Sequence, residues 1–126
     1  MLRERQKKGA LFRSYVSTSL VDKIARDFNC QIIKESTGFN NLAQKYRHYQ
    51  ADQFILAFEE SIGFLPSIKI NNDKDGIQSA LLIAEIANFC KQQQMTLIDY
   101  LDQIYQKYGF FIETTKKYCA RKCSWQ

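Results

Sequence analysis

Apolar and polar residues alternate along the chain with two spacings, one typical of strands and one typical of helices. Residues 11–17 (Leu-Phe-Arg-Ser-Tyr-Val-Ser) are rich in β-forming side chains and predict a short strand. After a cap at Thr18 or Ser19, helical spacing predicts a helix to about Phe28, whose apolar stripe consists of Leu20, Val21, Ile24, Ala25 and Phe28.

The same order of elements continues along the chain. Residues 31–35, centred on Ile32 and Ile33, predict a second strand, and residues 39–46 predict a second helix. The uninterrupted apolar run 54–58 (Phe-Ile-Leu-Ala-Phe) is typical of a strand that is covered on both faces. An acidic turn and a less regular stretch to Asn72 are expected after it.

Two longer helices are predicted next, over residues 76–92 and 96–108. The first is apolar on most of its sides, so we expect it to be buried against the sheet. The series strand–helix–strand–helix–strand predicts the α/β class, with a layered sheet of short, largely parallel strands flanked by helices. We expect residues 10–112 to form this domain.

Charge is concentrated at the two ends of the chain. The net charge of the 126 residues is +5. Residues 1–13 carry five Lys or Arg against one Glu, and residues 114–126 carry four Lys or Arg and no acid. Such a distribution is typical of solvated ends rather than of a nucleic-acid-binding face. We therefore expect a basic segment at residues 1–9 and a basic tail at 113–126, and nucleic-acid binding is the least favoured hypothesis.

The four cysteines do not form a recognisable metal or disulfide framework. Cys30 and Cys90 stand where buried thiols are common, while Cys119 and Cys123 lie in the basic tail without a second ligand pair for zinc. No apolar run is long enough to span a membrane, and no signal-peptide pattern opens the sequence. We expect a cytoplasmic protein with reduced thiols and no membrane partner.

The turn after the buried strand carries candidate binding residues. Residues 59–63 read Glu-Glu-Ser-Ile-Gly, which places two carboxylates and a hydroxyl at the end of an apolar strand. Ligands of open α/β sheets bind at such ends. Carboxylates accept hydrogen bonds from neighbouring hydroxyl groups, so this turn suits a ligand rich in hydroxyls. A solvated turn without a ligand explains the same pattern equally well.

A second polar segment, residues 71–76 (Asn-Asn-Asp-Lys-Asp-Gly), precedes the longest predicted helix. It has the oxygen spacing of a calcium loop, but Leu82 stands where the bidentate Glu of such a loop is required. Asp73 or Asp75 is a predicted helix N-cap. Lys74, beside the helix N-terminus, is a candidate contact for an anion or a phosphate group.

Together these segments resemble the phosphoglucomutase/phosphomannomutase family, the α-phosphohexomutases. The matching residues are Val16-Ser17-Thr18-Ser19, Asp22-Lys23-Ile24-Ala25, Thr37-Gly38-Phe39, Phe58 to Gly63, Asp73 to Ile77, Leu97 to Leu101 and Tyr105 to Gly109. They occur in the family's order and spacing over about residues 10–112. Each segment is weakly specific alone, whereas the series is strong.

The resemblance covers the third of the family's four domains, which recognises the sugar. It implies that Glu59 and Ser61 contact adjacent hydroxyls of a hexose phosphate, that Lys74 reaches the phosphosugar, and that Thr37 and Gly38 form a neighbouring contact loop. It also implies an isomerase of carbohydrate metabolism that acts by intramolecular phosphotransfer. In the family a phosphoserine in the first domain donates the phosphoryl group and Mg²⁺ is held by the second.

Several family features are missing from this sequence. There is no phosphoserine loop, no Asp-Gly-Asp-x-Asp-Arg metal loop and no phosphate-binding loop after Gly109. Asn40 and Asn72 stand where the family usually has Lys and Arg. We therefore expect a fragment that uses no cofactor and has no catalytic residue of its own, because phosphoryl transfer needs the missing charges. A free-standing sugar-phosphate-binding module is the alternative hypothesis.

The resemblance also predicts how well the chain folds. The family's third domain has further chain before Leu11, and residues 1–8 resemble only the end of a helix there. An uncovered apolar sheet surface or edge should result. We expect a marginally stable domain that self-associates.

Overall fold

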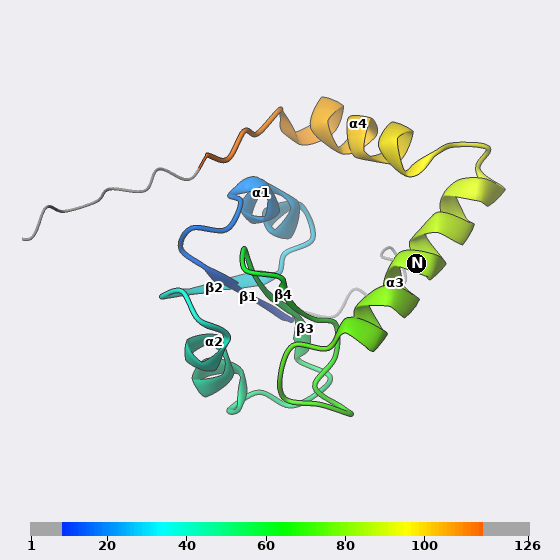
Figure 1. The fold of residues 1–126 in the computed structure, drawn as a ribbon. Coiled ribbons are helices and arrows are strands. Elements are labelled where there is room, and N and C mark those ends of the chain that lie inside the picture. Colours follow the sequence, from blue (N-terminus) through cyan, green and yellow to red (C-terminus); the bar gives the residue numbers. More distant parts are fainter. Residues whose placement is uncertain (1–8, 115–126) are drawn as a thin grey trace, which may run out of the picture.

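Four short strands form one mixed sheet in the order β2–β1–β3–β4 (Figure 1). The computed structural model describes residues 9–114. The strands are β1 (Ala10–Ser14), β2 (Gln31–Glu35), β3 (Phe54–Glu59) and β4 (Gly63–Leu65). β1 pairs in parallel with β2 and with β3, so the predicted class of an α/β domain with a largely parallel sheet is confirmed.

The fourth strand was not predicted from the sequence. β4 follows β3 after three residues and pairs with it antiparallel, with Glu59 opposite Gly63 and Ala57 opposite Leu65. It lies in the stretch for which the sequence predicted irregular structure. Three residues are too few to show a period of two, so its pairing with β3 is what defines it.

The first strand is shorter than predicted. It ends at Ser14 rather than Ser17, because the chain turns there and the Ser17 N–H donates to the carbonyl oxygen of Ser14 at 3.3 Å. The guanidinium of Arg13 donates to the carbonyl oxygens of Ser14 and Ser17 at 2.9 and 2.8 Å. These contacts fix the loop between β1 and the first helix.

Helices α1 (Leu20–Asp27) and α2 (Phe39–Tyr46) lie on opposite sides of the sheet (Figure 1). The main core lies between the sheet and α2. It consists of Ala10, Phe12, Phe39, Leu42, Ala43, Tyr46, Phe54, Ala57 and Leu65. The ring of Phe12 contacts Tyr46 edge-on and stacks on Phe54, with centroids 5.8 and 5.6 Å apart. Aromatic burial of this kind supplies much of the hydrophobic stabilisation of a small domain.

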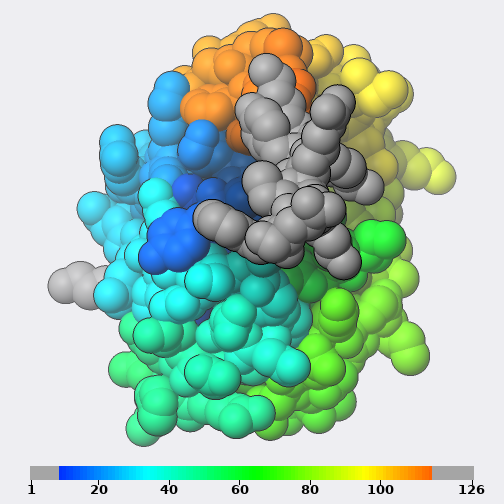
Figure 2. Space-filling model, turned by 60° about the vertical axis from the view of Figure 1, so that its left-hand side comes forward, coloured from blue at the N-terminus to red at the C-terminus, as the bar shows by residue number. Residues whose placement is uncertain are grey.

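Helices α3 (Gly76–Gln92) and α4 (Leu97–Tyr108) lead away from the sheet and back toward α1 (Figure 1). Thr96 caps α4 in a capping box with Asp99. The end of α4 is attached to α1, since Asp27 accepts hydrogen bonds from Lys107 and from the Tyr108 hydroxyl. Figure 2 shows residues near the end of the described chain, in orange, beside the blue N-terminal elements.

The prediction that the helix after Gly76 is buried was wrong. Cys90 is the only buried residue of α3, and its large apolar side chains Ile77, Leu81, Ile83 and Phe89 are 86%, 64%, 55% and 42% exposed. Among the described residues, α3 packs mainly on the edge strand β4 and on α4. A helix that is apolar on most sides is buried only if other elements pack on several of those sides. The described residues do not provide such elements around α3.

Three further expectations concerned membrane spans, the cysteines and the two ends of the chain. No helix among the described residues is long and apolar enough to cross a membrane. Cys90 is buried and Cys30 is half-buried, both as free thiols. The helix end predicted for residues 1–8, most of the basic tail from 113 onward, and Cys119 and Cys123 lie outside the described residues.

Candidate functional site

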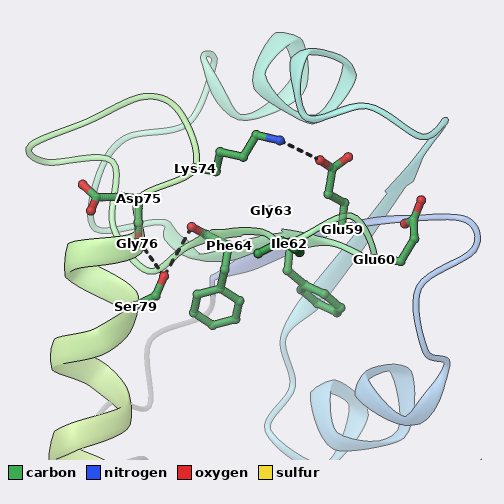
Figure 3. Close-up of a pocket in the computed structure, with 10 residues that line it drawn as sticks. Glu59, Glu60, Ile62, Gly63, Phe64, Lys74, Asp75, Gly76 and Ser79 are labelled. Carbon is green, nitrogen blue, oxygen red and sulfur yellow. Dashed lines mark hydrogen bonds and ion pairs between the residues drawn. The ribbon is translucent and has the colours of Figure 1, made fainter.

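A pocket of about 520 Å³ opens beside the β3–β4 hairpin and the start of α3. Ten residues line it: Phe58, Glu59, Glu60, Ile62, Gly63, Phe64, Lys74, Asp75, Gly76 and Ser79 (Figure 3). The volume is within the range of small-molecule sites. Both segments that the sequence analysis identified as candidates, residues 59–63 and 71–76, contribute to its wall.

Glu59 is the point at which the predicted site residues meet. It is the last residue of β3, and its side chain is only 3% exposed. Its Oε2 accepts a hydrogen bond from the Gly38 N–H at 3.0 Å, and its Oε1 lies 3.3 Å from the Lys74 Nζ. Figure 3 shows the Lys74 and Glu59 side chains pointing toward each other. Three segments far apart in sequence therefore converge on one carboxylate.

Gly38 presents its N–H to Glu59 because of an unusual backbone conformation. Its φ is +104°, in the region that favours glycine, and it is the residue before the first residue of α2. The preceding residue, Thr37, is exposed, and its carbonyl oxygen accepts a hydrogen bond from the Asn41 side chain at 2.8 Å. The predicted Thr37–Gly38 loop thus contributes a backbone donor at the Glu59 carboxylate.

Lys74 places a cation on a long side chain at the rim of the pocket. Its side chain is 46% exposed, and its ammonium lies 6.0 Å from the centre of the Phe39 ring. The pair is half-exposed at Lys74 but buried at Glu59, so Lys74 can turn to another anion only if another hydrogen-bond donor takes its place at the Glu59 carboxylate.

Asp75, not Asp73, is the N-cap of α3, which decides between the two predicted caps. Its Oδ1 accepts from the Ile77 and Gln78 N–H groups at 3.0 and 2.9 Å. The backbone hydrogen bond from Gln78 is the largest of the interactions that lower the pKa of the Asp75 carboxyl below its usual value. Because Asp75 occupies these donors, Lys74 rather than the helix N-terminus is the candidate contact for a phosphate group.

Glu60 and Ser61 differ from Glu59 in their placement. The Glu60 side chain lies beyond Glu59 as seen from Lys74 (Figure 3), and its Oε2 accepts from the Ser14 hydroxyl at 2.5 Å. This hydrogen bond is the largest cause of a lowered pKa at Glu60. Ser61 is exposed in the hairpin turn, adjacent to the pocket wall rather than part of it. The structure thus brings Gly38, Glu59 and Lys74 together and leaves Ser61 at the tip.

Gly63 lies in the candidate segment 59–63, but the sequence analysis gave it no role of its own. A Cβ atom at this position would lie 2.5 Å from Cγ and 2.8 Å from Oε1 of Glu59, and 2.8 Å from Cδ2 of Phe39. The Glu59 side chain therefore occupies space that only glycine at position 63 leaves open. A glycine four residues after a strand-ending Glu is the sequence signal, but without β4 its role was not evident.

The site combines a hydrogen-bond acceptor with a cation. Glu59 offers acceptor oxygens to hydroxyl groups and Lys74 offers a cation to an anionic group. Among residues 9–114 no group of three or more His, Cys, Asp or Glu side chains is placed to hold a metal ion. The described residues therefore do not fit the Mg²⁺ of the resembled family.

Comparison with known proteins gives the same family from independent evidence. Residues 1–108 match the family described as "Phosphoglucomutase/phosphomannomutase, alpha/beta/alpha domain III". A phosphomannomutase of Mycoplasmoides pirum is 35% identical over 122 residues, which are 95% of this chain and 22% of that protein. A phosphoglucomutase of Staphylococcus aureus is 41% identical over 100 residues, which are 79% of this chain and 18% of that protein.

The matches cover most of this chain but only a small part of each relative. A phosphomannomutase of Mycoplasma genitalium is 36% identical over 103 residues and is matched over 19% of its own length. The chain thus spans about a fifth of the length of these relatives. No solved structure matches significantly. From the family match and the α/β fold together, the chain belongs to the phosphoglucomutase/phosphomannomutase family and corresponds to its domain III.

Proposed function

We propose that this domain binds the sugar of a hexose phosphate at the pocket beside the β3–β4 hairpin, as the recognition part of a phosphohexomutase. The observation that carries the proposal is that the Gly38 N–H and the Lys74 ammonium both meet the buried carboxylate of Glu59. A cation and a hydrogen-bond acceptor side by side match the phosphate and the hydroxyls of one ligand. The names of the relatives support this ligand class, since they are a phosphomannomutase and a phosphoglucomutase.

Binding is proposed to begin with an exchange of partners at Lys74. The ligand phosphate draws the ammonium away from Glu59, and the freed Oε1 accepts a hydrogen bond from a sugar hydroxyl. Ser61, at the tip of the same hairpin, contacts the adjacent hydroxyl, and Thr37 and Gly38 border the ligand. Gly38 keeps its hydrogen bond to Oε2, so the carboxylate stays oriented during the exchange.

The affinity of this domain alone should be low. The pocket is open, and only a few charge-assisted hydrogen bonds are available. Each of them contributes about 1.5–3 kcal/mol before the entropy lost on binding is subtracted. We expect a dissociation constant of roughly 1 mM, equivalent to about −4 kcal/mol.

We further propose that the chain by itself does not interconvert hexose phosphates. Its sequence has no phosphoserine loop, and residues 9–114 hold no metal cluster. Phosphoryl transfer depends on positioning and on neutralised charge, which these groups provide. We place the protein in the cytoplasm, where Cys30 and Cys90 would stay reduced.

A titration followed by ¹H–¹⁵N correlation spectra tests the proposal. Glucose 6-phosphate, mannose 6-phosphate and glucose are added separately to the wild type, to Lys74→Ala and to Lys69→Ala. Lys69 is an exposed lysine outside the pocket and serves as the matched control. We expect Lys74→Ala alone to weaken both phosphosugars while glucose binds as before. Equal loss in both lysine variants would contradict the role of Lys74.

An activity assay separates binding from catalysis. Glucose 1-phosphate is incubated with the chain and Mg²⁺, and formation of glucose 6-phosphate is followed. We expect no conversion above that of a sample without protein. Conversion that scales with the amount of chain would overturn the proposal of a recognition domain without catalytic activity.

A further inference from the structure

The carboxylate of Glu60 is bound to a pair of buried hydroxyls on another loop. Its Oε2 accepts from the Ser14 hydroxyl at 2.5 Å and from the Ser17 hydroxyl at 3.4 Å. Ser14 is 0% and Ser17 is 7% exposed, and their hydroxyl oxygens are 2.7 Å apart. This contact joins the β3–β4 turn to the loop between β1 and α1, which is 43 to 46 residues away in sequence.

The two serines are themselves held in place by Arg13. Its guanidinium is 4% exposed and donates to both carboxylate oxygens of Asp22 at 2.9 Å. The same group donates to the carbonyl oxygens of Ser14 and Ser17. Because a bidentate Arg–carboxylate pair has a fixed geometry, the serine hydroxyls form a rigid pair of hydrogen-bond donors for the Glu60 carboxylate.

The turn that Glu60 opens is a strained one. Residues 60–62 connect the paired residues Glu59 and Gly63, so the loop has three residues. Three-residue hairpin loops commonly end in a residue in the left-handed region, where glycine is preferred. Here that residue is Ile62, with φ +57°. A β-branched residue is strained in this conformation.

The Ile62 side chain is 97% exposed, so its packing does not offset the strain. Strained backbone persists only where the surroundings fix it. Two carboxylates precede the strained residue: Glu59 is bound to Gly38 and Lys74, and Glu60 is bound to Ser14 and Ser17. Ser61 lies between Glu60 and Ile62.

We infer that Glu60 is a positioning residue that holds the β3–β4 turn, and with it Ser61, in the conformation in which Ser61 reaches the ligand. The Ser14–Ser17 pair is the anchor and the strained turn is the element that it fixes. The part of this inference that concerns the ligand rests on the proposed function, whereas the anchoring itself does not.

The inference distinguishes two carboxylates that are adjacent in sequence. Glu59 is expected to act by direct contact with the ligand and Glu60 through the backbone of the turn. Replacement of Glu60 by Gln keeps the size but loses the charge that strengthens the hydrogen bonds from the serine hydroxyls. The turn should then sample other conformations, and ligand affinity should fall about threefold to tenfold without any lost ligand contact.

Strain relief provides the decisive test. Glycine adopts a positive φ without cost, so Ile62→Gly should restore the turn when the anchor is absent. Ile62→Val keeps the β-branched side chain and the strain, and is the matched control. The variants are Glu60→Gln alone and combined with each of the two. Ser14→Ala removes the anchor from the other side and serves if Glu60→Gln does not fold.

The readouts are amide hydrogen exchange and ¹⁵N relaxation of residues 60–63 in the full chain, with glucose 6-phosphate titrations as a second arm. Loosening of the turn in Glu60→Gln, reversed by Ile62→Gly but not by Ile62→Val, supports the anchor. Unchanged exchange and relaxation of the turn in Glu60→Gln overturn the anchor, regardless of the result of the ligand titration. A loosened turn with unchanged affinity also overturns the positioning role.

The two arms also separate this inference from the proposed function. If the wild type shows no response to tens of millimolar ligand, the proposed function fails. The anchor is then judged by the exchange and relaxation data alone.

Discussion

Glu59 and Gly63 face each other across the β3–β4 hairpin, and the Glu59 side chain fills the space that a Cβ atom at position 63 would take. The Glu59 carboxylate and Gly63 are therefore one structural unit. The hydrogen bond from Gly38 then fixes which way the carboxylate points.

This relationship predicts the effect of Gly63→Ala. The added Cβ would clash with Cγ and Oε1 of Glu59 and with Cδ2 of Phe39, so the Glu59 side chain must move. Overpacking of this kind costs about 1–3 kcal/mol. We expect a lower urea midpoint and the loss of the protected Gly38 amide. A variant with the wild-type midpoint and the wild-type Gly38 amide signal would show that the site tolerates a Cβ.

The ion pair beneath the serine anchor predicts a pH dependence. The hydrogen bond from Arg13 is the largest cause that lowers the pKa of Asp22 below 3.8. A lowered folded-state pKa means that the stabilisation is present above the unfolded pKa and is lost as pH falls below about 4.

Asp22→Asn tests this dependence. At pH 7 it leaves the buried Arg13 unpaired, which should cost roughly 3 kcal/mol in the free energy of unfolding measured with urea. Below the folded-state pKa the wild type is protonated too, so the difference between the two proteins should narrow. Lys34 also contacts Asp22, but its side chain is 41% exposed. Lys34→Ala is therefore a control with a smaller expected effect. A difference that stays constant from pH 7 to pH 3 would contradict the assignment.

Tyr46 gives a second pH prediction in the alkaline range. Burial raises the pKa of its phenol to about 12, and its hydroxyl donates to the Asn72 carbonyl oxygen at 2.6 Å. A raised folded-state pKa means that stability is retained below about pH 10 and lost as pH rises toward 12. Difference absorbance should show one phenol fewer ionising near pH 10 in wild type than in urea. Tyr46→Phe should remove that late titration and cost about 1 kcal/mol. If Tyr46→Phe still showed a phenol that ionises well above pH 10, that ionisation would belong to another tyrosine.

The exposed apolar residues of α3 predict self-association of the isolated chain. Leu81 is 64% exposed and Ile77 is 86% exposed on a helix with few charges. Exposed apolar area of this kind promotes association. Sedimentation velocity should show concentration-dependent oligomers, and Leu81→Glu should reduce them more than Val16→Glu, an exposed control on another loop.

Thermal stability is a companion measurement for the same surface. We expect a domain of marginal stability, since much apolar side-chain area of α3 and α4 remains in water. A strictly monomeric chain that melts cooperatively well above about 65 °C would contradict both expectations.

The sequence predicted the elements whose pattern is local. The strand 54–58 appeared as a continuous apolar run, and the cap of α3 followed from an aspartate before Gly76. The candidate residues Glu59 and Lys74 were predicted from the strand end and the helix start, and the structure brings them within 3.3 Å.

What could not be predicted depends on contacts between distant segments. β4 is defined by its pairing with β3, and the role of Gly63 depends on that pairing. The anchor of Glu60 links residues 46 positions apart, and neither Ser14 nor Glu60 shows this in its own surroundings. The exposure of α3 is the opposite case, because its apolar pattern indicates burial but not what provides the cover.

The most direct test of the central claim is a ¹H–¹⁵N titration of wild type, Glu59→Gln and Glu85→Gln with glucose 6-phosphate to tens of millimolar. Glu85 is exposed on α3 outside the pocket and is the matched control. We predict shifts at Gly38 and residues 59–63 with a dissociation constant of roughly 1 mM in wild type and Glu85→Gln, and none in a folded Glu59→Gln. Equal responses in Glu59→Gln and wild type, or no response in wild type, would contradict sugar recognition by the Glu59 carboxylate.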